Sequence, residues 1–183
     1  ETRREASIIY SDRTNPESQR PRYTSFNITL NNYSDYDYKK GGISYLSPSS
    51  GYLLSLQSGR ASLIPLSKNI ISDVSGSTNL IASNVVLGEA LAQQGVQGCD
   101  SPESVVENDD RVYYASKKDG KIFLYATGSG VKDISTNVIG SSIRRRIKEL
   151  SSTDGSTRVI GGYDSLKEEY LITIIAFNSI DVN

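Results

Sequence analysis

The segment that most constrains the fold is Arg111–Ala126, which reads RVYYASKKDGKIFLYA. Asp119-Gly120 lies between two runs rich in Val, Tyr, Ile and Phe, which predicts an antiparallel hairpin with a tight turn at that dipeptide. Because side chains alternate faces along a strand, each run places apolar residues on both faces. An antiparallel sheet normally leaves one face to water. We therefore expect other layers of the protein to cover this hairpin on both sides.

Two further segments repeat this pattern. Gly51–Ile64 reads as a hairpin that turns at Ser58-Gly59 and is closed by Pro65, and Arg158–Ile175 reads as a third hairpin with apolar residues on both faces. The copies begin about 50 to 60 residues apart, near the blade-sized period of propeller proteins. Stacked four-stranded sheets bury both faces, so the pattern favours a mainly β fold of antiparallel β-propeller-type blades, part of a larger propeller. A β-sandwich or an irregular all-β domain is the alternative.

On these patterns the chain divides into three parts. Residues 1–67 contain N-terminal strands and the first blade-like hairpin. Residues 68–103 are rich in Ser, Asn, Gly and Gln, and we expect an irregular excursion there. Residues 104–183 contain the other blade-like hairpins and one helix. Short strands are expected outside the hairpins at Ala6–Tyr10, Tyr23–Leu30, Ser104–Glu107 and Val131–Ile134.

The one predicted helix is Asn137–Leu150. Apolar residues recur in it at helical spacing, Asn137 caps its first turn, and Ser151-Ser152 and Asp154-Gly155 are expected to end it. The consecutive arginines 144–146 fan across roughly 200° of the helix, because each residue turns it by about 100°. We therefore expect a solvated face or a subunit contact for them, in preference to a grip on phosphate.

Composition limits the chemistry of the chain. Its 183 residues include no His and one Cys, and the net charge is −1. Without His there is no Ser-His-Asp or Cys-His arrangement and no His-bearing metal site. Cys99 is expected to be either a small core residue or an incidental loop residue, and the charge offers no wide attraction to nucleic acid. No apolar run is long enough to span a membrane. We expect no catalytic residue, cofactor or metal site.

Three short motifs are weak candidates for chemistry. Asp35 and Asp37 carry the oxygens that Ca²⁺ or Mg²⁺ takes, but they lack further ligands and read better as an exposed loop. The adjacent pairs Asp109-Asp110 and Glu168-Glu169 point to different sides of a strand, so neither pair converges for acid–base work. Ser152–Thr157 is similar to the aspartate-box turn of sialidases, but it is one residue short and lacks the following aromatic, so we expect a hairpin loop.

Five pieces of the chain together resemble a known family. They are ASIIYSD near the start, a Gly-Gly-Ile that leads into a strand, PESVV at Pro102–Val106, VYYASKKDGKIFLYATGSGVKDIS, and GGYDSLKEEYLITI. In this order they resemble the tail nozzle or muzzle proteins of short-tailed bacteriophages, most of all those of the crAss-like group. The resemblance implies a non-enzymatic, propeller-containing structural protein of the virion. The resemblance further implies that copies assemble as a ring below the portal, which lines or closes the channel for DNA ejection.

The resemblance also implies the partners. They are other copies of the chain in a ring, the remaining part of its own polypeptide, and portal, ring or other tail proteins, with passing contact to genomic DNA and no membrane. The absence of Met indicates a processed product or a piece of a longer polypeptide. About 40 to 50 residues per blade allow three or four blades, whereas closed propellers have about 4–8. We expect the loops and the helix Asn137–Leu150 to contact neighbouring subunits.

The main alternative is a carbohydrate-binding or glycan-cleaving β-propeller used in host recognition. Aromatic side chains make platforms for sugars, and the candidates are Tyr33, Tyr36, Tyr38, Tyr45 and Tyr52. Trp is absent, and these Tyr side chains serve equally well as packing at strand ends. A scaffold for protein–protein recognition in a cell is a second alternative.

Overall fold

The computed structural model describes residues 4–11, 24–26, 29, 32–72, 78–136, 140–154 and 157–176. Over these residues the chain is mainly β, and every strand pair is antiparallel. A single α-helix follows the third sheet. The prediction of a mainly β, antiparallel fold with one helix is confirmed for the described part of the chain.

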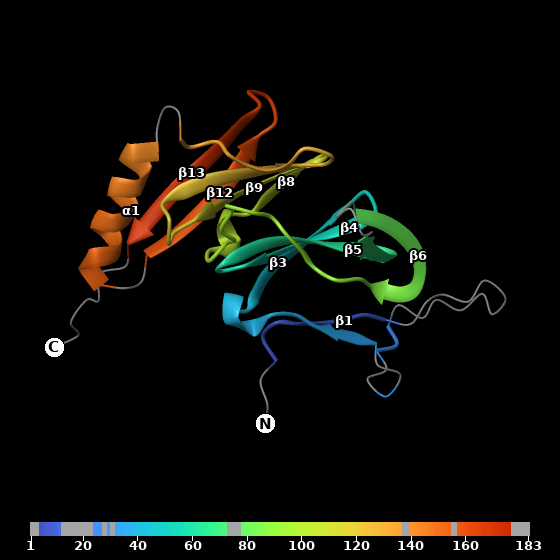
Figure 1. Cartoon of the computed structure of the whole chain (residues 1–183). Helices are drawn as coiled ribbons and strands as arrows, with labels where there is room; N and C mark the ends of the chain where they lie inside the picture. Colours follow the sequence, from blue (N-terminus) through green and yellow to red (C-terminus); the bar gives the residue numbers. More distant parts are fainter. Residues whose placement is uncertain are drawn as a thin grey trace.

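Four sheets lie on one another in the order in which the chain builds them (Figure 1). The first pairs β1 (Ser7–Ile9) with β2 (Tyr33–Asp35). The second has the order β3 (Ile43–Ser49), β4 (Tyr52–Gln57), β5 (Arg60–Ser72) and β6 (Thr78–Leu87), with β7 (Leu91–Ala92) paired to β5. The third has the order β11 (Gly130–Asp133), β10 (Lys121–Ala126), β9 (Arg111–Ser116) and β8 (Val106–Asn108). The fourth pairs β12 (Thr157–Asp164) with β13 (Glu169–Ala176). The helices are η2 (Tyr38–Lys40), η3 (Pro102–Ser104) and α1 (Gly140–Asp154).

Two apolar clusters hold the first three sheets together. Ile8 of β1 packs with Ile64 of β5, which joins the first sheet to the second. Leu54 of β4 belongs to a second cluster with Tyr114 of β9 and Phe123 of β10, which joins the second sheet to the third. Leu54, Ile64 and Tyr114 are fully buried. The second sheet is therefore covered on both faces.

The third sheet is covered on both faces as well. On the face toward the second sheet, the rings of Tyr114 and Phe123 stack with centroids 5.3 Å apart. On the opposite face, the ring of Tyr113 stacks on Tyr163 and Tyr170 of the fourth sheet, at centroid distances of 5.6 and 5.3 Å. The prediction that other layers enclose the hairpin Arg111–Ala126 is confirmed.

The predicted hairpin turn at Asp119-Gly120 is present, but it takes four residues in place of a two-residue connection. Strand pairing stops at Ser116 and Lys121, so four residues connect β9 to β10. The carboxylate of Asp100 accepts hydrogen bonds from the first two backbone N–H groups of this loop, at 2.8 and 3.0 Å. These bonds hold the two residues away from the ladder. Gly120 completes the loop in the left-handed region, with φ of 63°, where glycine pays no steric penalty.

Strand β5 continues past Pro65, where the sequence pattern predicts its end. It pairs with β4 up to Pro65 and with β6 from Leu66 onward. Proline has no N–H to donate, but pairing with β4 ends at this residue, so no donor is missing. Its carbonyl accepts a hydrogen bond from the N–H of Gly88 at 2.9 Å. The register shifts between Leu66 and Lys68, so the strand changes partner at an irregularity.

The expectation of an irregular excursion over residues 68–103 needs correction. This stretch contains the end of β5, the whole of β6 and the short strand β7. Strand β6 pairs with β5 from Thr78 opposite Ser72 to Leu87 opposite Leu66. Its sequence, TNLIASNVVL, lacks a clean alternation of polar and apolar residues. The pairing depends on the extension of β5, which the sequence pattern did not predict.

The remaining strand predictions have mixed outcomes. The hairpin Arg158–Ile175 is confirmed as β12–β13, and the strands expected at Ala6–Tyr10 and Val131–Ile134 are confirmed as β1 and β11. The strand expected at Ser104–Glu107 begins only at Val106, because the preceding residues form η3.

One predicted strand falls mainly on residues that are not described. Of Tyr23–Leu30, the structure describes residues 24–26 and 29, and these form no strand. The rest of that prediction lies outside the described residues.

The predicted helix is confirmed as α1. Ile147 is 2% exposed, so its apolar face packs inward as predicted. The helix does not end at Ser151-Ser152 but runs to Asp154, because serine lowers helix propensity only slightly. Residues 152–154 are therefore helical and not a hairpin loop. Asn137, the predicted cap, and residues 155–156 lie outside the described residues.

Candidate functional site

Both ends of the stack expose apolar side chains. The first end face is the outward side of β1–β2, formed by Ser7, Ile9, Tyr33 and Asp35, which share a side because they are cross-strand partners. The second end face is the outward side of β12–β13, formed by Ile160, Gly162, Leu171 and Thr173. Ile9 is 50% exposed on the first, and Ile160 and Leu171 are 39% and 53% exposed on the second.

The first end face is hollowed. A cavity of about 310 Å³ is lined by Arg4, Ser7, Ile9 and Tyr33. The guanidinium of Arg4 lies 5.3 Å from the ring centroid of Tyr33, within range of a cation–π contact. It also lies 3.3 Å from a carboxylate oxygen of Asp35. A charged rim thus surrounds an apolar floor.

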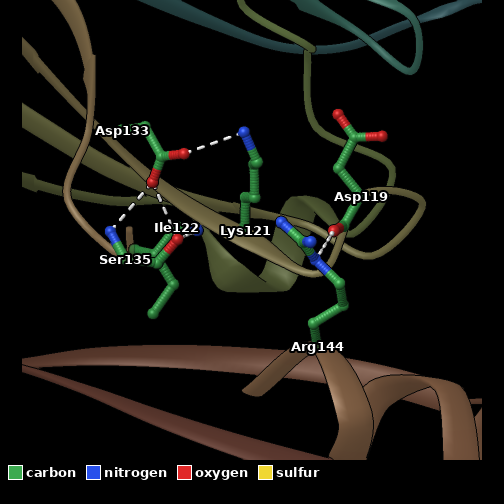
Figure 2. Close-up of polar contacts among 6 residues, drawn as sticks. All are labelled: Asp119, Lys121, Ile122, Asp133, Ser135 and Arg144. Carbon is green, nitrogen blue, oxygen red and sulfur yellow. Dashed lines mark hydrogen bonds and ion pairs between the residues drawn. The ribbon is translucent and has the colours of Figure 1, made fainter. Parts of the chain in front are cut away.

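A polar cluster ties the edge of the third sheet (Figure 2). A carboxylate oxygen of Asp133 lies 3.0 Å from Nζ of Lys121. The other accepts hydrogen bonds from N and Oγ of Ser135 at 2.9 and 2.8 Å. Oγ of Ser135 in turn accepts from the backbone N–H of Ile122 at 3.2 Å. These bonds fix the chain where it leaves β11.

The same cluster controls the charge of Asp133. Burial acts to raise the pKa of Asp133, but hydrogen bonds from Thr136, Lys121 and Ser135 outweigh burial and hold that pKa well below the usual range of an aspartate. Asp133 is therefore ionised throughout the neutral range, and its charge offsets that of Lys121.

A basic hollow lies between α1 and the β9–β10 loop. It has a volume of about 390 Å³ and is lined by Lys118, Asp119, Lys121, Arg144 and Lys148. Arg144 holds the helix to the loop, because its Nε donates to the backbone carbonyl of Asp119 at 3.2 Å. The sequence pattern pointed to the consecutive arginines and missed this hollow. The spacing of Arg144 and Lys148, four residues apart on one helix face, is the signal that could have indicated it.

A larger groove runs beside the first sheet. It has a volume of about 560 Å³ and is lined by residues 34–37, Arg60, Val85 and residues 87–90. The hydroxyl of Tyr36 donates to the carbonyl of Gly88 at 3.3 Å, and burial raises the pKa of Tyr36 to about 12. The groove is lined by three acidic side chains, Asp35, Asp37 and Glu89, and by one cation, Arg60.

The five candidate tyrosines do not form one platform. Tyr33 lies on the first end face, while Tyr36 packs into the cluster between the first and second sheets. Tyr45 packs against the other cluster, between the second and third sheets. Tyr38 is 75% exposed in η2, and Tyr52 begins β4.

The carboxylates at 35 and 37 serve local structure. Asp35 binds Arg4 and the hydroxyl of Ser7, and Asp37 caps η2 by accepting from the N–H of Lys39 at 3.0 Å. Asp37 is an exposed loop residue, as expected, and also lies 4.0 Å from Arg60, whereas Asp35 is the last residue of strand β2. Over the described ranges, no group of three or more His, Cys, Asp or Glu side chains is arranged to hold a metal ion.

The other acidic pairs lie at hairpin ends and not along a strand as expected: Asp109 and Asp110 connect β8 to β9, and Glu168 is the last loop residue before β13. Asp109, Asp110 and Glu168 line one hollow of about 300 Å³, together with Arg111. The sequence pattern of each adjacent pair does not indicate that the ends of two hairpins lie together. One cation and three acidic side chains therefore give this hollow a charged lining.

Cys99 is a core residue, the first of the two expected roles. It is fully buried in the cluster between the second and third sheets, and burial raises the pKa of its thiol. Its Sγ donates to the carbonyl of Ser101 at 3.0 Å.

In the part of the chain that the structure describes, no helix has the length and apolar character needed to cross a membrane. Neither a protein-family model nor a curated protein sequence matches the chain.

Proposed function

We propose that the chain is a structural, non-enzymatic segment of a phage tail nozzle or muzzle in the virion. Its sheets serve as propeller-type blades, and copies assembled in a ring line or close the channel through which DNA is ejected. The resemblance of five segments to the nozzle proteins of crAss-like phages supports the virion part of this proposal. The two end faces support the part that concerns assembly, and they are the observation on which it depends most.

The exposed apolar side chains of the two end faces favour the packing of a further layer on each side. A two-stranded sheet is marginal by itself and gains stability when a layer packs on it. The inner face of each outer sheet is packed, and the outer face carries exposed Ile9 at one end and exposed Ile160 and Leu171 at the other. Continuing the stack from one copy to the next would cover these side chains.

The occupant that we propose for each end face is the opposite end face of a second copy. The two faces differ, since the first is a hollow with the charged rim of Arg4 and Asp35 and the second is a ribbon with Leu171. Contact between two different faces is heterologous, and such contacts form a ring when their rotation closes.

Substitutions on each end face test this arrangement. We expect Ile9→Lys and Leu171→Lys each to leave the chain as a 20.0 kDa monomer at concentrations where the wild type associates. An equimolar mixture of the two variants keeps one intact face of each kind and therefore forms capped dimers. Sedimentation velocity measures both results. Dimers of either variant alone would show a two-fold symmetric contact and overturn the head-to-tail arrangement.

Ile134→Lys is the matched control. Ile134 is 45% exposed, like the two test residues, but it lies just beyond β11 and outside both end faces. We expect this variant to associate as the wild type does. If it stays monomeric, a general loss of apolar surface explains the other variants and the assembly proposal fails.

The virion part needs a separate measurement. Quantitative mass spectrometry of purified virions should find the chain at a fixed copy number that matches a ring. Absence from virions that eject DNA normally would overturn the nozzle assignment and leave the assembly experiments standing.

A carbohydrate-binding role is the second candidate, because the 560 Å³ groove joins the ring of Tyr36 with Asp37, Arg60 and Glu89. Aromatic and charged groups together are typical of a polar ligand site. A glycan array tests it, with a glycosidase assay beside it. Sugar-dependent binding that Arg60→Gln abolishes would favour this function over the nozzle.

A further inference from the structure

We propose that the basic hollow binds consecutive phosphate groups, as in a nucleic-acid backbone or a short oligophosphate. This inference goes beyond the proposed function and does not rest on it. The lining residues come from two elements that are distant in sequence, the β9–β10 loop and α1.

The cations of the hollow have few counter-ions. Lys121 has one, because a carboxylate oxygen of Asp133 lies 3.0 Å from its Nζ. For the ammonium groups of Lys118 and Lys148, no hydrogen-bond or ion-pair partner is found among the residues that the structure describes. Like charges four residues apart on a helix repel each other, as Arg144 and Lys148 do. A bound anion would relieve that repulsion.

Arg144 presents its guanidinium to the same hollow. Its Nε is used by the carbonyl of Asp119, so the two terminal nitrogens keep their donors for a ligand. A planar guanidinium with several N–H donors suits phosphate oxygens. Asp119 also lines the hollow, but Figure 2 shows its carboxylate turned away from the guanidinium of Arg144.

The absence of a side chain at Gly120 allows α1 to pack closely on the β9–β10 loop. A Cβ on Gly120 would lie 2.7 Å from Cα of Arg144, so the helix backbone passes directly over this residue. Lys118 thereby comes beside Arg144 and Lys148, and the three cations line one cavity. The cavity of about 390 Å³ holds the volume of more than ten water molecules at about 30 Å³ each, enough for hydrated phosphates.

The small net charge of the chain does not oppose this. At about 0.15 M ionic strength the Debye length is about 8 Å, so distant acidic groups are screened. Of two acids near the hollow, Asp133 pairs with Lys121, and both carboxylate oxygens of Asp100 accept backbone N–H groups of the β9–β10 loop. The attraction is therefore local to the hollow and depends strongly on salt.

Binding of a fluorescent DNA duplex, measured by anisotropy from about 0.01 M salt upward, tests the proposal. We expect the double variant with Lys118→Gln and Lys148→Gln to weaken binding on the order of tenfold at low salt. Each lost phosphate contact should also reduce the slope of log K against log salt by about 1. Lys148 is exposed and without a described partner, so Lys148→Gln alone keeps the fold and gives the same direction.

Arg145 and Arg146 provide matched controls on the same helix. They pair with Glu149, at 3.6 and 3.9 Å, and do not line the hollow. Arg145→Gln and Arg146→Gln remove the same charge, and we expect each to change affinity by less than about twofold. Equal losses in the control and test variants would overturn the site in favour of diffuse charge attraction.

Competition with tripolyphosphate separates the two phosphate sources. Displacement of the duplex by tripolyphosphate, lost in Lys148→Gln, supports a phosphate site that takes either source. Binding of tripolyphosphate without binding of DNA supports the site with an oligophosphate as its ligand. If neither probe binds the wild-type chain at low salt, the proposal is wrong.

Discussion

The hairpins β9–β10 and β12–β13 have connecting loops of the same length, but different residues stand at the last position of the loop. In both, four residues link the strands and the last of them is left-handed, Gly120 with φ of 63° and Glu168 with φ of 56°. Helix α1 lies on the first loop and leaves no room for a Cβ, whereas Glu168 is exposed. Strand register therefore sets the loop geometry, and the layer above the loop decides whether glycine is needed.

The two hairpins also differ in how many of their faces other layers cover. The inner hairpin has layers on both sides and buries Tyr114 and Phe123 almost completely. The outer hairpin is covered on one side only, so Leu171 is 53% exposed. The outward face of β12–β13 combines Ile160, Leu171 and Ile175 with Arg158, Thr173, Asp164 and Glu169. Position in the stack and this partly polar face together leave the outer hairpin at the surface.

The largest expected effect is the loss of a core ring. We expect Tyr114→Ala to lower the free energy of unfolding by about 3–5 kcal/mol, because the cavity cannot close between two rigid sheets. Leu171→Ala in the outer hairpin should cost less than about 1 kcal/mol. Urea unfolding followed by circular dichroism measures both. Similar costs would mean that the outer hairpin is as enclosed as the inner one.

Next in size is the contact between the inner loop and the helix. We expect Gly120→Ala to cost about 2–3 kcal/mol, from the left-handed backbone and from displacement of α1. Gly128 serves as the control, because its φ is 79° and nothing lies within 4 Å of the position that a Cβ would take. Gly128→Ala should cost only the backbone strain of about 1–2 kcal/mol. Equal values for both variants would show that the helix yields freely.

A third comparison concerns the carboxylates beside each hairpin. We expect Asp133→Asn to cost about 1–2 kcal/mol at pH 7, since charged hydrogen bonds are lost. The pKa of Asp133 is lowered by folding, so its stabilisation is complete above its unfolded pKa of about 3.9 and is lost as pH falls below that value. The gap between wild type and variant should therefore narrow from pH 7 to about pH 3, as urea unfolding at each pH would measure.

Asp164 is the matched position in the outer hairpin. It accepts hydrogen bonds from N–H groups of Leu166 and Lys167 at 2.9 and 3.3 Å within its own exposed loop. Asp164→Asn should cost less than about 1 kcal/mol. If the difference in free energy of unfolding between wild type and Asp133→Asn does not change with pH, the shape of the Asp133 side chain, and not its charge, stabilises the fold.

The smallest effect has the opposite sign. We expect Glu168→Gly to raise the free energy of unfolding by about 0.5–1 kcal/mol, because glycine adopts the left-handed conformation without the penalty of a side chain. Thermal unfolding of this variant beside Gly120→Ala would show one substitution stabilising and the other destabilising at equivalent loop positions. A destabilised Glu168→Gly would mean that the side chain of Glu168 makes a contact worth more than the backbone strain.

The sequence predicts what depends on local pattern. Alternation and the apolar content of Arg111–Ala126 correctly indicated a hairpin covered on both faces, and helical spacing located α1 around Ile147. The four-residue length of the hairpin loop was not predicted, because it depends on Asp100, which lies outside the hairpin and accepts hydrogen bonds from the first two N–H groups of the loop. Strand β6 was missed because its partner is the part of β5 beyond Pro65.

The candidate surfaces were harder to predict than the strands. The basic hollow combines Lys118 with Lys148, which are brought together only when α1 packs over Gly120. The end faces depend on which sheet is last in the stack. The five tyrosines are close in sequence, yet Tyr36 and Tyr45 enter different clusters because they lie in different strands and loops.

The order of the sheets has a consequence for synthesis on the ribosome. Each sheet is built from one stretch of chain, and each packs on the sheet made just before it. A newly formed sheet therefore waits for about 50 residues before its free face is covered, roughly 3 to 10 seconds at ribosomal speed. The chain can fold sheet by sheet as it emerges, and within the described residues the outward faces of the first and last sheets are the ones that no later segment covers.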